Sequence, residues 1–152
     1  MARINTDGLD EFVAQLESLG KATQPFMKAA VWEGAHVVAD SIKSAIGGIP
    51  VQDEYVPPDK TRAGITSEEK AGLTAGFGIT KMRVGDNVDV RIGFKGKAVS
   101  GESNAAIARS VESGTSFMAK HPFVRPAVNR ARAAAMAAMS KKFGEMIDKV
   151  MD

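Results

Sequence analysis

The segment from Val111 to Ala127, VESGTSFMAKHPFVRPA, constrains the fold of this chain most strongly. Glycine adopts positive φ angles without steric cost, so Ser113-Gly114-Thr115 predicts a turn. Pro122 and Pro126 each restrict the preceding residue towards extended geometry. The sequence therefore predicts an extended arm over residues 115–125. Such an arm can dock on a neighbouring molecule, or it can simply connect two elements and cover the chain's own core.

A long final helix is predicted from about Pro126 to Met151. Proline suits the first helical position, where its missing N–H costs nothing. The alanine run that follows has high helix propensity, and its small side chains let another element approach closely. The predicted apolar stripe of this helix consists of Met136, Met139, Phe143, Met146, Ile147 and Val150.

Two helices are predicted in the N-terminal third. The first runs from Leu9 to Leu19, with an apolar residue every three or four positions, and Gly20 is expected to end it. The second starts at Thr23 or Gln24, with Pro25 in its first turn, and runs to about Ile46. Its predicted apolar face consists of Phe26, Ala30, Val37, Val38, Ile42 and Ala45.

The middle of the chain predicts a long loop followed by a β-hairpin. Residues 47–66 are rich in proline and glycine, and loops of this length in a compact domain are usually functional or disordered. Ser67 to Lys70 predicts one helical turn. Residues 77–84 and 87–94 alternate in polarity around Gly85-Asp86-Asn87, which is typical of a hairpin turn. Residues 105–111 predict a short helix or strand.

This order of elements predicts an α+β fold. Long helices on one side and a hairpin on the other favour a small antiparallel sheet packed against two long helices. A chain of 152 residues fits a single domain over residues 1–152 and can bury a core.

Composition argues against several classes of function. With 20 basic and 18 acidic residues the net charge is only +2, less basic than a dedicated duplex-binding protein. The chain has no cysteine, no apolar run long enough to span a bilayer and no signal-peptide core at its N-terminus. We therefore expect a soluble protein. The histidines, His36 and His121, lack partners at metal-binding spacing, and no nucleophile or phosphate-loop motif occurs, so we expect no catalytic, cofactor or metal site.

The ordered residues Glu112, Gly114 and Thr115, followed by Pro122-Phe123, Arg125-Pro126 and Ala127, form a more specific pattern. This pattern resembles the signature of a family of tail components of long-tailed phages, the tail-completion or head–tail joining proteins. The resemblance implies a non-catalytic virion protein of the neck or upper tail, assembled in the host cytoplasm. It also implies a ring of copies, typically six, around the DNA channel. Its partners would be adjacent neck, tail-terminator or tail-tube proteins.

Within this resemblance, the candidate interface residues are Glu112, Gly114, Thr115, Phe123, Arg125 and Pro126. The family's Thr-Gly-x-Leu stretch, which opens a strand, is matched by Ala71-Gly72-Leu73-Thr74. That match lies well downstream, so residues 47–66 contain an insertion relative to the family. We expect this loop and the arm to contact neighbouring copies.

Basic residues gather at the start of the final helix, where Arg125, Arg130 and Arg132 lie close in sequence. Cations are unfavourable near a helix N-terminus unless they are paired. These arginines can form salt bridges to acids such as Glu112, in the same chain or a neighbour, and we favour that reading. Alternatively they contact phosphates, which would suit a small basic protein that binds DNA non-specifically.

Overall fold

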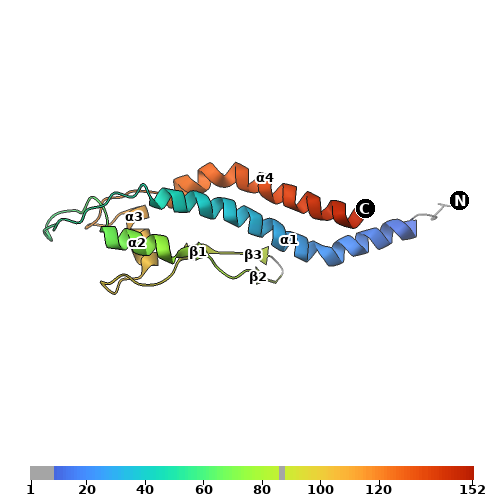
Figure 1. Cartoon of the computed structure of the whole chain (residues 1–152), viewed down its shortest axis with the longest axis horizontal. Coiled ribbons are helices and arrows are strands. Elements are labelled where there is room, and N and C mark those ends of the chain that lie inside the picture. Colours follow the sequence, from blue (N-terminus) through green and yellow to red (C-terminus); the bar gives the residue numbers. More distant parts are fainter. Residues whose placement is uncertain (1–8, 86–87) are drawn as a thin grey trace.

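A computed structural model of the chain describes residues 9–85 and 88–152, with side chains from Thr23 onward. It contains α1 (Leu9–Ile46), α2 (Ser67–Gly76), β1 (Phe77–Ile79), β2 (Arg83–Val84), β3 (Val88–Asp89), β4 (Ile92–Phe94), α3 (Asn104–Ser113) and α4 (Val124–Met151). The molecule is elongated, with α1 and α4 antiparallel along its length and the other elements on the opposite side of α1 (Figure 1). The predicted α+β fold, in which a small antiparallel sheet accompanies two long packed helices, is confirmed.

The two helices predicted in the N-terminal third form the single helix α1, so the predicted end at Gly20 is wrong. Glycine inside a helix costs only about 1 kcal/mol relative to alanine, and the surrounding leucine, glutamate, lysine and alanine residues favour helix. Pro25 lies inside α1, where it removes one backbone hydrogen bond. Figure 1 shows α1 bending in its blue N-terminal half, the half that contains this proline.

The helices α1 and α4 pack together, and both bury small side chains. The buried alanines are Ala30, Ala35 and Ala39 of α1 and Ala127, Ala131 and Ala135 of α4. A Cβ on Gly34 would lie 2.6 Å from both Cγ and Sδ of Met139, so the helices approach closely here. The alanine run predicted that another element approaches the final helix closely, and that element is α1.

The buried face of α4 differs from the predicted stripe. Met136 was predicted to face the core, but 63% of its surface is exposed. Met139, Phe143, Met146, Ile147 and Val150 are half-buried. Phe143 meets buried Phe26 of α1 edge-to-face, with 6.1 Å between ring centroids. The prediction assumed that the largest apolar residues mark the buried face, whereas the close contact with α1 needs the alanines there.

The β-hairpin is present but interrupted. β1 pairs antiparallel with β4 in the register Phe77↔Phe94, and β2 pairs with β3 in the register Val84↔Val88. Between these ladders Lys81 and Met82 oppose the single residue Val90, which is the arrangement of a β-bulge. The predicted continuous strands are therefore wrong in their middle. Of the predicted turn, Asp86 and Asn87 lie outside the described residues.

The loop over residues 47–66 is held in place from both ends. Val51 and Ile65 form a parallel bridge, in which Gln52 N–H donates to Ile65 at 2.8 Å and Ile65 N–H donates to Pro50 at 3.0 Å. The Lys70 ammonium donates to the carbonyls of Gly47 and Ile49, at 2.8 and 3.0 Å. The loop is thus anchored where it leaves α1 and where it enters α2.

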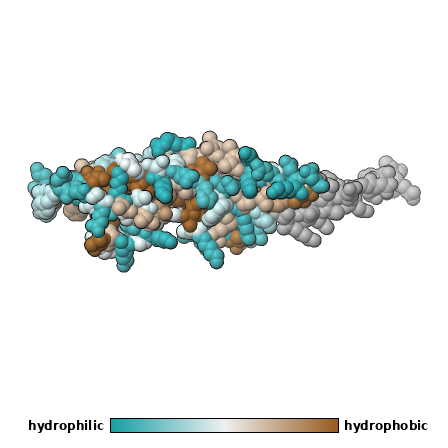
Figure 2. All heavy atoms as spheres, viewed as in Figure 1, coloured by the Kyte–Doolittle hydropathy of each residue, from teal (hydrophilic) through white to brown (hydrophobic). Residues whose placement is uncertain are grey.

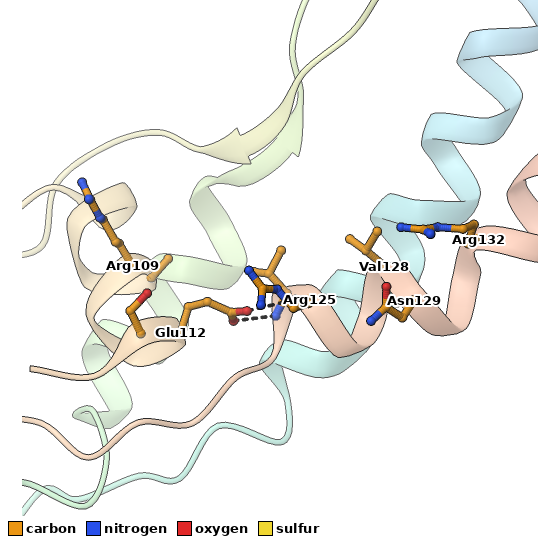
Figure 3. A pocket seen from close by; sticks show the side chains of 9 residues that line it. Arg109, Glu112, Arg125, Val128, Asn129 and Arg132 are labelled. Carbon is orange, nitrogen blue, oxygen red and sulfur yellow. Dashed lines mark hydrogen bonds between the residues drawn. The ribbon is translucent and has the colours of Figure 1, made fainter.

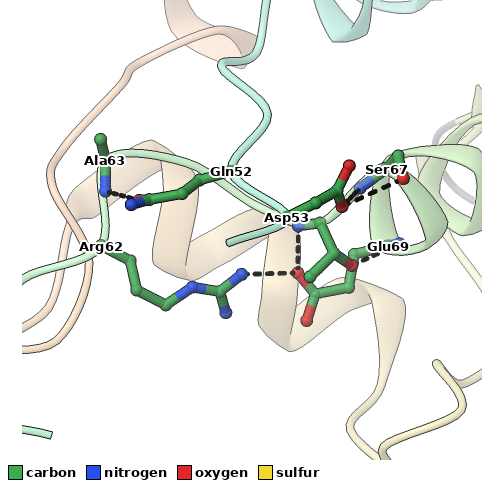
Figure 4. Close-up of polar contacts among 7 residues, drawn as sticks. Gln52, Asp53, Arg62, Ala63, Ser67 and Glu69 are labelled. Atoms are coloured by element: carbon green, nitrogen blue, oxygen red, sulfur yellow. Dashed lines mark hydrogen bonds and ion pairs between the residues drawn. The ribbon is translucent and has the colours of Figure 1, made fainter. Parts of the chain in front are cut away.

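The helix α2 is longer than the single predicted turn and includes Ala71 to Thr74, where the family pattern implied the opening of a strand. Thr66 and Glu69 form a capping box, with each side chain accepting from the other's backbone N–H. Asp53 also accepts from the backbone N–H of Ser67 at 2.7 Å (Figure 4). These caps favour helix from Ser67 onward, and fully buried Leu73 holds the helix against the core.

The core lies where the C-terminal end of α1 meets the loop, α2, α3 and the start of α4. Its buried members are Ile42, Ile46, Ile49, Ile65, Leu73, Ile107, Ala108, Val111, Phe123 and Ala127. Asn104 is also buried, and its amide donates to the carbonyls of Gly72 and Lys95 at 3.2 and 3.0 Å. This side chain ties the start of α3 to α2 and to the end of the hairpin.

Candidate interface at the start of the last helix

Glu112, in the last turn of α3, caps the N-terminus of α4. Its Oε2 accepts from the backbone N–H groups of Phe123 and Val124 at 2.7 and 2.8 Å, and its Oε1 accepts from that of Arg125 at 3.0 Å. The first N–H groups of a helix lack partners within the helix, so one carboxylate here satisfies three of them. The bonds to Val124 and Arg125 are drawn in Figure 3.

The charge of Glu112 suits this position. Burial of the carboxyl acts to raise its pKa. The three backbone N–H groups and the nearby Arg125 guanidinium outweigh burial, so the pKa lies below its ordinary value of 4.5. The carboxylate also faces the positive end of the α4 dipole. The sequence predicted a salt bridge between an arginine and an acid such as Glu112, in the same chain or a neighbour. Within the chain, Glu112 accepts these backbone hydrogen bonds instead.

Gly114 and Thr115 make the turn that leads α3 into the arm. Gly114 has φ 73° and ψ 160°, a conformation almost restricted to glycine, and a Cβ there would lie 2.9–3.1 Å from atoms of Lys120. Thr115 Oγ1 accepts from the backbone N–H groups of Phe117 and Met118, at 3.1 and 3.0 Å. The chain leaves the helix at Gly114 as predicted, but Ser113 is still helical and the hydrogen-bonded turn runs from Thr115 to Met118.

The arm pairs with the loop over residues 47–66. Arg62 N–H donates to the Phe117 carbonyl, and Ala119 N–H donates to the Arg62 carbonyl, both at 2.8 Å. Arg62 also lies 3.6 Å from Glu69, which links the pairing to the cap of α2 (Figure 4). The arm docks on another segment of its own chain. The predicted extended geometry over residues 115–125 is wrong at both ends, because Thr115 to Met118 form a turn and Val124 and Arg125 belong to α4.

Phe123 and Pro126 complete the candidate set at the entry to α4. Phe123 is only 3% exposed and meets Phe94 of β4 edge-to-face at 6.2 Å, so it is a core residue. The helix begins at Val124, two residues before the predicted start, and Arg125 is helical although it precedes a proline. Pro126 in the first turn removes an N–H that would have no partner within the helix.

An open groove of about 530 Å³ runs between α3 and α4 beside this cap. Three arginines line it, Arg109 from α3 and Arg125 and Arg132 from α4 (Figure 3). Ala108, Val124 and Val128 supply apolar surface. Among the side chains that the structure describes, no carboxylate lies within salt-bridge distance of these arginines.

Further apolar side chains reach the surface near the loops. Tyr55 in the 47–66 loop is 82% exposed, Phe117 in the arm 67% and Val99 in the loop after β4 83%. Figure 2 shows hydrophobic side chains interrupting the polar surface at the loop-bearing end and along the middle of the viewed face. Together with the groove, these residues form a candidate contact surface at the end of the molecule that holds the arm.

The structure brings the six predicted residues together but divides their roles. Glu112, Gly114, Thr115 and Phe123 hold α3, the arm and α4 together, whereas the Arg125 side chain is exposed and Pro126 half-buried. Sequence reasoning did not identify Arg109 as a member of the basic group or Asn104 as a tie between elements. Asn104 directly follows the capping residue Ser103, and no periodic pattern in the sequence predicts its contacts.

Comparison of the chain with protein-family models, with curated proteins and with solved structures finds no match. No group of three or more potential metal-binding side chains occurs among the residues described. None of the described helices is both long and apolar enough to cross a membrane.

Proposed function

We propose that this chain is a structural subunit of the neck or upper tail of a long-tailed phage. In this proposal copies assemble as a ring, with six the number typical of the resembled family, and DNA passes through the channel without sequence-specific binding. The subunits act through contacts with each other and with adjacent neck, tail-terminator or tail-tube proteins. They need no cofactor and catalyse no reaction.

The observation that carries this proposal is the clamp around Glu112. The residues that carry the resemblance are spread over positions 112–127, yet Glu112, Gly114, Thr115 and Phe123 each have a definite geometric role at one junction. A carboxylate must accept three amides there, and a glycine must occupy a conformation that other residues avoid. A chance match of common residues would not be expected to form one interdependent unit.

The distribution of exposed groups supports a role in contacts between proteins. The exposed aromatic side chains Tyr55 and Phe117 and the groove arginines lie at the loop-bearing end, and aromatic residues and arginine are enriched at protein interfaces. The long α1–α4 pair gives each copy an extended, stiff body.

Native mass and electron microscopy of the purified chain test the proposal first. We expect light scattering to show a concentration-dependent shift towards one discrete oligomer, and negative-stain images to show rings with a central hole. Complementation is the stricter test: a long-tailed phage lacking the corresponding gene should yield tailless or empty particles that the intact chain rescues. Normal infectious particles without the gene would refute the proposal.

Non-specific DNA binding is the second candidate, because four exposed arginines, Arg109, Arg125, Arg130 and Arg132, lie on or near α4, and no described carboxylate is within salt-bridge distance of them. Anisotropy of a labelled duplex titrated from 50 to 300 mM salt separates the two functions. Duplex binding that weakens steeply with salt would favour this candidate. A structural subunit should bind weakly or not at all at physiological salt.

A further inference from the structure

The groove between α3 and α4 carries more positive charge than its own chain balances. Arg109, Arg125 and Arg132 line it, and its one carboxylate, Glu112, already accepts three backbone N–H groups. Positive charges gathered beside a helix N-terminus are unfavourable unless a negatively charged partner compensates them. The groove therefore fits an anionic segment, and its surfaces from Val124 and Val128 fit an apolar or aromatic side chain between the charges.

The loop over residues 47–66 carries a segment of matching chemistry at its outer part. Residues 54–59, Glu-Tyr-Val-Pro-Pro-Asp, hold two exposed carboxylates, and no described basic group lies within salt-bridge distance of either. Tyr55, 82% exposed, lies between them in sequence. Pro57 and Pro58 restrict the backbone, so less conformational entropy is lost when the segment binds.

The segment does not reach the groove of its own chain. The loop is fixed by the Val51–Ile65 bridge and by the pairing of Arg62 with the arm. Figure 1 shows the loop projecting at the end of the molecule, beyond α2 and α3. An anionic segment on a loop anchored at both ends, and a cationic groove that none of its residues lines, are complementary between copies.

We propose that residues 54–59 of one copy bind in the α3–α4 groove of a second copy. Glu54 and Asp59 pair with the groove arginines, and Tyr55 packs on Val124 and Val128. In this arrangement the contact is head-to-tail. It leaves the first copy with a free groove and the second with a free loop, so further copies can add to form a ring or a filament. The contact rests on the proposed function for its biological role. The contact itself requires only that the chain self-associates.

Charge reversal on each side, followed by mixing, tests the contact. The loop variant is E54R/D59R and the groove variant is R109E/R132E; K141E/K149E on α4 is a matched control at exposed lysines outside the groove. Sedimentation velocity measures weight-average mass from 1 to 200 µM, and far-ultraviolet circular dichroism checks folding. We expect the intact chain and the control to associate, and each reversed variant alone to show at least a tenfold weaker association.

Mixing distinguishes a specific contact from a general effect of charge. An equimolar mixture of the two reversed variants offers native loops to native grooves and reversed loops to reversed grooves, so we expect association to return. Strictly monomeric intact protein, association unchanged in both variants, or no recovery in the mixture would each overturn the proposed contact. Duplex DNA bound by the intact chain and lost in R109E/R132E, without self-association, would assign the groove to nucleic acid instead. If the sedimentation results contradict the contact but E54R/D59R still rescues the phage in the complementation assay, the contact is rejected and the proposed neck function is kept.

Discussion

Replacing Glu112 by alanine tests the central structural claim, that one carboxylate holds the start of α4. The change removes the acceptors of three backbone N–H groups, those of Phe123, Val124 and Arg125. Loss of an ordinary N-cap costs about 0.5–2 kcal/mol. The N–H of buried Phe123 would also lack a partner, at about 1–3 kcal/mol, whereas the Arg125 N–H is exposed and can bind water.

Together these costs lead us to expect that Glu112→Ala lowers the free energy of unfolding by about 1.5–5 kcal/mol. At about 2–4 °C per kcal/mol for a domain of this size, Tm should fall by roughly 3–20 °C. Thermal and urea unfolding followed by circular dichroism at pH 7 measure both quantities. Glu145→Ala, at an exposed position on α4, is the matched control. A loss at Glu112 no greater than about 0.5 kcal/mol beyond the control, the usual range for plain surface substitutions, would refute the capping argument.

Three further predictions follow from the same geometry. Folding lowers the pKa of Glu112, so the stabilisation by its carboxylate is complete above the ordinary pKa of 4.5 and is lost as pH falls through the folded pKa. The stability difference between the intact chain and Glu112→Gln should therefore shrink below about pH 4.5. A constant difference down to about pH 2.5 would contradict this. Gly114→Ala should cost about 2–3 kcal/mol, from backbone strain and contact with Lys120, as measured by urea unfolding, and a neutral result would show that the turn relaxes. A double-mutant cycle of Gly34→Ala and Met139→Ala should show coupling of at least about 0.5 kcal/mol, because Met139 occupies the space of the new methyl group, whereas additive effects would exclude that contact.

Much of the fold follows from local signals in the sequence. Turn chemistry and alternating polarity predicted the hairpin, and the alanine run predicted the final helix, because these signals depend on neighbours within a few residues. The bulge at Lys81-Met82 could not be predicted in this way. There Thr80 Oγ1 accepts from the N–H of Arg91, a contact across the hairpin that alternation does not encode.

The candidate site shows a similar limit. The sequence identified Glu112 as important but predicted an arginine as its partner, because charge pairs are inferred from residue types alone. Its actual partners are backbone amides 11 to 13 residues later, which only the folded path of the arm brings within reach. Met136 was misplaced for a related reason: which face of α4 is buried depends on how closely α1 approaches, and the alanines, not the largest apolar side chains, permit that approach.

The division of roles among the candidate residues decides which substitutions inform on function. Phe123→Ala or Glu112→Ala would perturb the core or the cap, so defective particles from either variant would not separate a lost fold from a lost contact. Tyr55, Arg109 and Arg132 are exposed. Substitutions there should leave the free energy of unfolding within about 0.5 kcal/mol while altering association. An assembly defect at these exposed positions, with an unchanged Tm, would therefore locate an interface, which the residues that carry the resemblance cannot do alone.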